Sequence, residues 1–195
     1  ELPSTQHLVS ITYSSSRDNP TENITQDEYL VCTALGGRDC RKMACDPKFR
    51  HMKFLPWGGV AAHLTRNNDP AGRLNGNAFC FLPLPVETGM PIHINGYFEL
   101  SSNRRDIWVG QDMTGEGRVR SEWNELLLSD VIGPLYAKML SHASLLLGPG
   151  DQYNNLWPLN DSPQMPWQVV TKSFYSDARK LPLFYSRSLK ELDDN

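Results

Sequence analysis

The chain has 195 residues, which is long enough to bury a hydrophobic core and favours one domain, or one domain with an appendage. Its 39% hydrophobic and 21% charged residues are typical of a soluble globular protein and exclude an intrinsically disordered one. A formal net charge of -3 argues against a nucleic-acid-binding module, which would carry a basic excess. We therefore expect no nucleic-acid partner.

The first half of the chain predicts a mixed sheet of roughly five strands. Residues 9–13 and 28–35 are β-rich, and the turn signal at 18–20 makes them antiparallel neighbours. Residues 38–54 predict a connector with a short helix. The remaining strands are expected at 58–65, 79–82 and 92–100.

The last of these runs alternates between two faces, as a half-buried strand does. The apolar face carries Ile92, Ile94, Phe98 and Leu100, and the polar face carries His93, Asn95, Tyr97 and Glu99. We expect this strand to place Arg104 and Arg105 at its end.

The last third predicts helices. Ser121 is the expected N-cap of a helix that stops at Gly133-Pro134, and a second helix is expected from Leu135 to Leu147. A third is expected to begin with Ser162 and Pro163. The fold class is therefore α+β, with a sheet-containing part at 1–117 and a mainly helical part at 118–195, packed on the first or extending from it.

Residues with metal-binding or nucleophilic side chains show no recognised spacing. The four cysteines are expected to be reduced, mostly buried thiols. A zinc site from Cys40, Cys45, His51 and His63 is conceivable, but no compact cysteine pair occurs and we predict no metal.

No serine lies in a nucleophile elbow, and no phosphate-binding loop is present. His93 is expected to be a solvated side chain rather than a catalytic base. The sequence therefore predicts no catalytic residue in the isolated chain and no cofactor bound by it. An independent hydrolase with a noncontiguous site is the lesser alternative.

The Arg104-Arg105 pair is the strongest candidate for an anion site. Guanidinium groups remain charged and present a fork of donors that matches carboxylate or phosphate, so a pair fixed at a strand end suits an anion on a neighbouring domain. The alternative is a solvated turn, or an ion pair with Asp106 or Glu99.

Three blocks of the chain, 55–61, 79–108 and 121–128, resemble the large internal repeat of the sacsin family, very large chaperone-like proteins linked to an ataxia. The most specific elements are Pro-Leu-Pro-x-Glu-Thr-Gly at 83–89 and Asn-Gly-Tyr-Phe-x-Leu-Ser-Ser-Asn-Arg-Arg at 95–105. The resemblance extends to the tail around Trp157, Trp167 and 183–186, and so covers most of the chain.

The resemblance implies a segment that follows an ATP-binding domain and corresponds to the middle domain of the ninety-kilodalton heat-shock chaperones. In those chaperones an arginine after a strand reaches the γ-phosphate of ATP held by the neighbouring domain, which implies this role for Arg105, with Arg104 as the near alternative.

The implied function is a non-catalytic, cytoplasmic chaperone module that binds client proteins and is coupled to the adjacent ATP-binding domain. Client contact is expected around the 83–91 connection or between the later helices. A structural spacer in a giant scaffold is the alternative.

Overall fold

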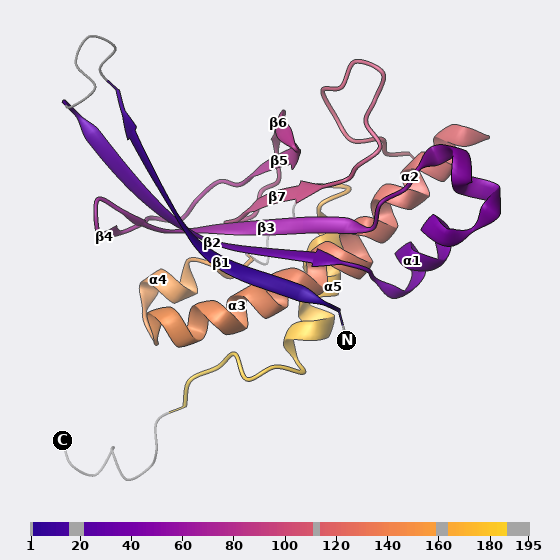
Figure 1. Ribbon diagram of the computed structural model, residues 1–195. Helices are drawn as coiled ribbons and strands as arrows, with labels where there is room; N and C mark the ends of the chain where they lie inside the picture. The colour runs from indigo at the N-terminus through magenta and orange to yellow at the C-terminus, as the bar shows by residue number, and fades with distance from the viewer. Residues whose placement is uncertain (1, 16–21, 111–113, 159–163, 187–195) are drawn as a thin grey trace.

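The computed structural model describes residues 2–15, 22–110, 114–158 and 164–186, and it shows an α+β fold (Figure 1). The strands are β1 (Ser4–Ser14), β2 (Ile24–Leu35), β3 (Trp57–Arg66), β4 (Asp69–Pro70), β5 (Asn77–Cys80), β6 (Leu82–Glu87) and β7 (His93–Gly96). The helices are α1 (Arg38–Cys45), α2 (Glu116–Leu127), α3 (Gly133–Leu147), α4 (Asp151–Asn154) and α5 (Gln168–Ala178), with a 3-10 helix η1 (Pro47–Met52) and a π-helix η2 (Leu128–Ile132).

The sheet has seven strands in the order β1-β2-β3-β7-β5-β6, with β4 paired to β3. All neighbours are antiparallel except β5 and β7, which are parallel, so the predicted mixed sheet is confirmed. The prediction of roughly five strands missed β4 and β6. Strand β6 contains Pro83 and Pro85. Because proline has no N–H to donate to a neighbouring strand, this segment was predicted to be a connection and not a strand.

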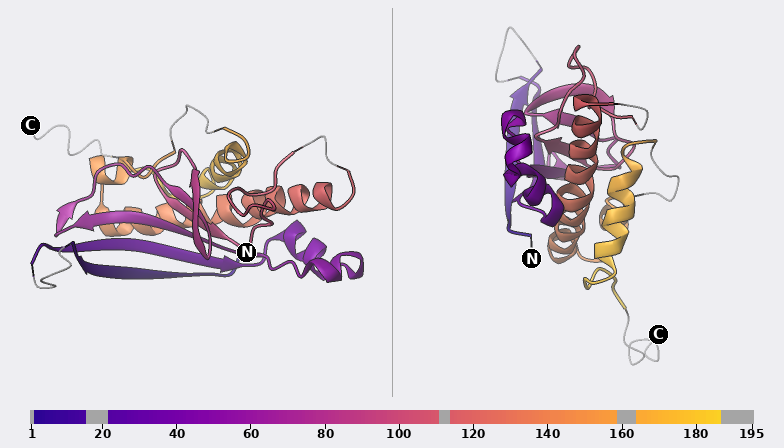
Figure 2. Two further views of the ribbon diagram at one scale, coloured as in Figure 1. Left: turned by 90° about the horizontal axis from the view of Figure 1, so that it is seen from above. Right: turned by 90° about the vertical axis from the view of Figure 1, so that its right-hand side faces the viewer.

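Helices α3 and α5 lie on one side of the sheet (Figure 2). Helix α3 packs on β2 and β3, and α5 packs on the other side of α3. The side chains on the covered face are buried, namely Leu30, Cys32 and Ala34 of β2 and Val60, Ala62 and Leu64 of β3. Buried residues of the sheet and of the helices form one hydrophobic core cluster. The division of the chain into a sheet-containing part at 1–117 and a mainly helical part at 118–195 stays a prediction.

The predicted helix boundaries at Ser121 and Gly133 are wrong. Helix α2 already begins at Glu116, and the Ser121 hydroxyl lies inside it, where it accepts a hydrogen bond from the Gly110 N–H at 3.1 Å. The chain instead stays helical through η2 into α3, and Ile132 and Gly133 both have right-handed helical φ and ψ. The Gly133 N–H bonds to the Leu128 carbonyl, so a wider π-helical turn directly precedes Pro134, which has no N–H to donate.

Two further segments differ from the predicted elements. The expected strand at 92–100 is shorter, since β7 ends at Gly96. An added Cβ at Gly96 would lie 2.7 Å from the ring of Phe98, so the chain approaches itself closely at this point. The turn at 18–20 and the helix start at Ser162 and Pro163 lie outside the described residues, and the described helix α5 begins at Gln168.

Candidate functional site

The arginine loop, residues 101–106, is closed at its base by an antiparallel bridge between Leu100 and Ile107. The N–H of Ser101 donates to the Asp106 carbonyl at 2.8 Å, and the N–H of Arg104 donates to the Ser101 carbonyl at 2.8 Å. Arg104 has a φ of 54°, a left-handed conformation that is uncommon for a residue other than glycine. The loop is therefore a tight turn with a defined hydrogen-bond pattern.

Both arginines of this loop are exposed, and neither forms an ion pair with a carboxylate of the described residues. The two carboxylates that the sequence offered as partners are engaged elsewhere. Asp106 accepts the N–H of Ile107 at 2.8 Å, and Glu99 accepts from Arg120 at 2.5 Å. The structure therefore does not show the internal ion pair that the sequence left open for Arg104 and Arg105.

Helix α2 fixes the base of the arginine loop through Asn124, which is only 1% exposed. The Asn124 side-chain oxygen accepts the Glu99 N–H at 2.8 Å. Its amide nitrogen donates to the carbonyls of Glu99 at 2.8 Å and Trp108 at 2.9 Å. One buried amide thus satisfies three backbone groups on the two segments that flank the loop.

Two more contacts hold the same segment on α2. The Trp123 indole N–H donates to the Tyr97 carbonyl at 2.9 Å, and Arg120 pairs with Glu99 in a partly buried position. Trp123 is itself fully buried and stacks on Phe54, with ring centroids 4.3 Å apart. The loop therefore projects from a rigid support, and its two guanidinium groups can bind an oxyanion presented by another domain.

Asn124 was not predicted as a site residue, although the sequence carries a signal for it. Asn124 is a polar residue in the run Trp123 to Leu128, and its position on the buried side of α2 requires hydrogen-bond partners. Which backbone groups it would satisfy depends on the path of residues 97–108, which the sequence does not reveal.

A second polar cluster lies at one end of the sheet, around Asp27 of β2. The side chain of Asp27 is 5% exposed and accepts hydrogen bonds from Arg66 at 2.8 Å, His63 at 3.0 Å and Tyr13 at 3.2 Å. The Arg66 hydrogen bond is the main cause that holds the pKa of Asp27 below its ordinary value. This cluster was also missed by the sequence analysis.

The predicted solvated position of His93 is wrong. His93 is half-buried, its Nδ1 accepts the Asn77 N–H at 3.1 Å, and its ring meets that of Phe79 edge-on. Burial lowers the pKa of His93 below its ordinary value, and nearby His63 lowers it further. Among the described residues His63 is hydrogen-bonded to the Asp27 carboxylate and His93 to the Asn77 N–H, so neither histidine is hydrogen-bonded there to a hydroxyl or a thiol.

The residues considered for zinc lie apart. Cys40 is buried in the core, Cys45 is exposed, His51 lies 3.7 Å from Glu116, and His63 belongs to the Asp27 cluster. Among the described residues no group of three or more histidine, cysteine or carboxylate side chains could hold a metal ion. All four cysteines are free thiols, as predicted, but only Cys32 and Cys40 are buried, while Cys80 is half-buried and Cys45 is exposed.

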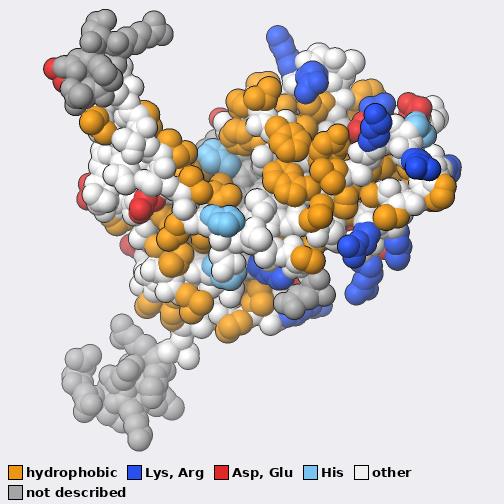
Figure 3. Space-filling view, in the orientation of Figure 1, with side chains coloured by type: hydrophobic (Ala, Val, Ile, Leu, Met, Phe, Trp, Pro, Cys, Tyr) orange, Lys and Arg blue, Asp and Glu red, His pale blue; other side chains and the backbone are white. Residues whose placement is uncertain are grey.

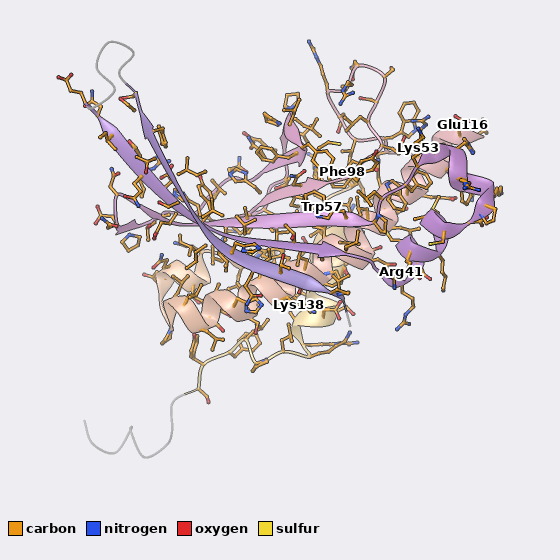
Figure 4. The ribbon with its side chains drawn as sticks, in the orientation of Figure 1. Arg41, Lys53, Trp57, Phe98, Glu116 and Lys138 are labelled. Carbon is orange, nitrogen blue, oxygen red and sulfur yellow. The ribbon has the colours of Figure 1, made fainter. Side chains whose placement is uncertain are left out.

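The sheet face opposite the helices carries an apolar groove of about 350 Å³. Its lining includes Val9, Ile11, Tyr29, Val31, Trp57, Phe79 and His93. The Trp57 ring, marked in Figure 4, stacks on that of Phe81 at 5.5 Å, and Figure 3 shows hydrophobic side chains gathered over β5, β6 and β7. We refer to this surface as the apolar groove.

The surfaces expected to contact a client are only partly exposed. Within the 83–91 connection Leu84 and Met90 are buried, while Leu82 just before it is 70% exposed. At the end of α3, Leu145 is 85% and Leu146 is 51% exposed. In the described part of the chain no helix is long and apolar enough to span a membrane.

Comparison with known proteins gives one significant relative among curated proteins. The chain is 38% identical over 144 residues to human sacsin, a match that covers 72% of this chain and 3% of sacsin. The chain thus spans a small fraction of its relative's length. No family model matches the chain, and no solved structure gives a significant match.

Proposed function

Because this chain is a sacsin-related segment, we propose that it is a non-catalytic module of a chaperone-type repeat that is coupled to an adjacent ATP-binding domain. The module acts in the cytoplasm, binds no cofactor of its own and contacts ATP only on the neighbouring domain. Client proteins are its second class of partner. The observation that carries the proposal is the anchored arginine loop, whose two arginines are exposed and form no ion pair with a carboxylate of the described residues.

The proposed mechanism is electrostatic. Charge develops on the transferring phosphoryl group of ATP, and a guanidinium aimed at that group stabilises it. Arg105 takes this role, with Arg104 as the alternative. Because Asn124 and Trp123 hold the base of the loop on α2, little further ordering of the backbone is needed when the two domains meet.

The test compares ATP turnover by this segment alone with turnover by the two-domain protein in which it follows its ATP-binding domain. We expect no turnover by the segment alone. In the two-domain protein, Arg105→Ala should lower turnover by about tenfold or more. The matched control is Arg118→Ala, an exposed arginine on α2 whose partner is Glu122 at 2.8 Å, and it should leave turnover unchanged.

Turnover that is indifferent to both loop arginines would contradict the coupling role and favour the structural spacer. Turnover by the isolated segment would favour the hydrolase instead. Arg104→Ala tests which of the two arginines contacts the phosphate, because the variant with the larger loss of ATP turnover identifies that arginine.

The apolar groove supports client binding as a second activity of the same module. Exposed apolar surface of this extent commonly marks an interaction site, and the described lining of the groove contains no lysine, arginine, aspartate or glutamate. An apolar stretch of an unfolded polypeptide fits this chemistry. Phe79→Ser should weaken suppression of aggregation of a denatured model protein, whereas Leu55→Ser, at an exposed leucine outside the groove, should not.

A further inference from the structure

The outer edge of β1 is an unpaired strand edge in the described structure. Strand β1 is at one end of the sheet order and pairs only with β2 (Figure 2). The pairing runs over all eleven residues from Ser4 to Ser14 without a register shift. The edge is therefore long and regular.

The hydrogen bonds at both ends of this pairing show which backbone groups face outward. The Leu35 N–H donates to the Pro3 carbonyl, and the Ser15 N–H donates to the Asn23 carbonyl. Hydrogen-bonded pairs alternate along an antiparallel ladder, so the odd-numbered residues of β1 face β2. The even-numbered residues, including Gln6, Leu8 and Ser10, direct their N–H and carbonyl groups away from the sheet.

This edge lacks the features by which soluble proteins block strand addition. Natural edges carry charged side chains, proline or bulges. The opposite edge strand, β6, has Pro83, Pro85 and Glu87, whereas β1 contains no lysine, arginine, aspartate, glutamate or proline. One edge of the sheet is thus protected and the other is open.

An apolar shelf lies beside the open edge, on the side of the helices. It surrounds a groove of about 310 Å³ lined by Gln6, Leu8, His142, Leu145 and Leu146, among others. Leu145 is 85% exposed and Leu8 is 63% exposed. A strand added to β1 would place the side chains of its helix-facing side on this shelf. The side chains of its other side would lie beside Val9, on the sheet face that carries the apolar groove.

We infer that the strand which covers this edge is β1 of a second copy of this chain, paired antiparallel about a two-fold axis. The described linings on both sides of this edge contain no lysine, arginine, aspartate or glutamate, which favours an uncharged strand with apolar residues on both faces. Strand β1 has this pattern, with Leu8 inward and Val9 and Ile11 outward. With Val9 opposite Val9, Leu8 of each copy faces Ser10 of the other. In this arrangement the inward side chains of both copies lie on one face of the joined sheet, and the outward side chains lie on the other. The outward-directed N–H and carbonyl groups of the two β1 strands form hydrogen bonds with each other, and no like charges lie opposite one another.

Sedimentation of the chain from low to high micromolar concentration tests this arrangement. We expect a concentration-dependent dimer, with slowed hydrogen exchange at the Leu8 and Ser10 amides as the dimer forms. Leu8→Lys places two lysines in one interface and should raise the dimer dissociation constant by about tenfold or more. Leu55→Lys, at an exposed leucine away from the edge, is the control and should leave it unchanged.

Ser10→Pro provides an independent variant, because it removes one outward N–H and leaves the ladder with β2 intact. It should shift the chain to monomer while the far-ultraviolet circular dichroism spectrum stays that of the wild type. A wild-type chain that is monomeric at every concentration, or a dimer insensitive to both β1 variants, overturns the inference. A monomer that instead binds an added uncharged peptide strand also overturns it, since the partner would then be a different chain.

Discussion

Replacement of Asn124 by alanine should destabilise the protein and loosen the arginine loop. The substitution removes three hydrogen bonds of 2.8 to 2.9 Å from a site that is 1% exposed. At about 1 kcal/mol for each buried hydrogen bond, the free energy of unfolding should fall by about 3 kcal/mol. The Glu99 carbonyl keeps the Trp108 N–H as a second donor at 2.8 Å, which limits the loss.

Urea denaturation of the wild type and the variant measures this difference directly. The control is Glu122→Ala on the exposed side of α2, which breaks only a solvent-exposed pair with Arg118 and should cost less than about 0.5 kcal/mol. A loss below about 1 kcal/mol for Asn124→Ala would refute the conclusion that this amide anchors the loop.

Asn124→Asp distinguishes the donor from the acceptor role of the same side chain. A carboxylate can still accept the Glu99 N–H, but it faces the carbonyls of Glu99 and Trp108 without a proton to donate. We expect this variant to be at least as unstable as Asn124→Ala at neutral pH and to recover stability as the pH falls. A pH-independent difference from wild type would contradict this assignment.

Three further predictions concern other parts of the fold. The pKa of Asp27 is lowered chiefly by its arginine partner, so its ionised form adds stability that is present above about pH 4 and is lost as the pH falls through the lowered pKa. Asp27→Asn should therefore be less stable than wild type at pH 7. Urea denaturation should show that the difference in free energy of unfolding between the two proteins is smaller at pH 3. A difference that does not change with pH would contradict a stabilising role of the ionised carboxylate. Gly76→Ala should cost about 3 kcal/mol or more in thermal denaturation, because the new Cβ would lie 1.7 Å from the Ile92 carbonyl oxygen, whereas Gly72→Ala meets nothing within 4 Å. Equal losses for the two glycines would contradict this packing. Cys45 is the exposed thiol and should be alkylated fastest in the native state, as mass spectrometry can show, and rapid labelling of a buried thiol would be inconsistent with the structure.

Much of the sheet could be predicted from local sequence, because short β-rich runs bounded by turn residues indicate strands. Residues 28–35 and 58–65 were expected as strands, and β2 and β3 occupy those positions. Strand β6 was not predicted, because proline on an edge strand looks the same in sequence as proline in a connection. The helix end expected at Gly133-Pro134 was wrong, because the chain stays helical there through the π-helical turn η2.

For the candidate site, the sequence identified the arginine pair but not the support that holds it. The expected place of the pair at the end of a strand is wrong, because β7 ends at Gly96 and the pair lies in a loop closed by the Leu100–Ile107 bridge. The sequence did not reveal the exposure of the pair either, because Glu99 and Asp106 were both available as partners. In the structure Glu99 accepts from Arg120, and Asp106 accepts from the Ile107 N–H. The role of these arginines towards a phosphate remains a prediction.

The α+β class and the relationship to sacsin could be derived from the sequence, because the class follows from the order of strand-like and helix-like segments and the relationship from identity along the chain. For the described residues, only the tertiary contacts show which backbone groups Asn124 satisfies, which sheet face α3 covers, and which edge of the sheet is unpaired. Those features arise where segments distant in sequence meet, and the free energy of such contacts depends on distances and burial that no local pattern records.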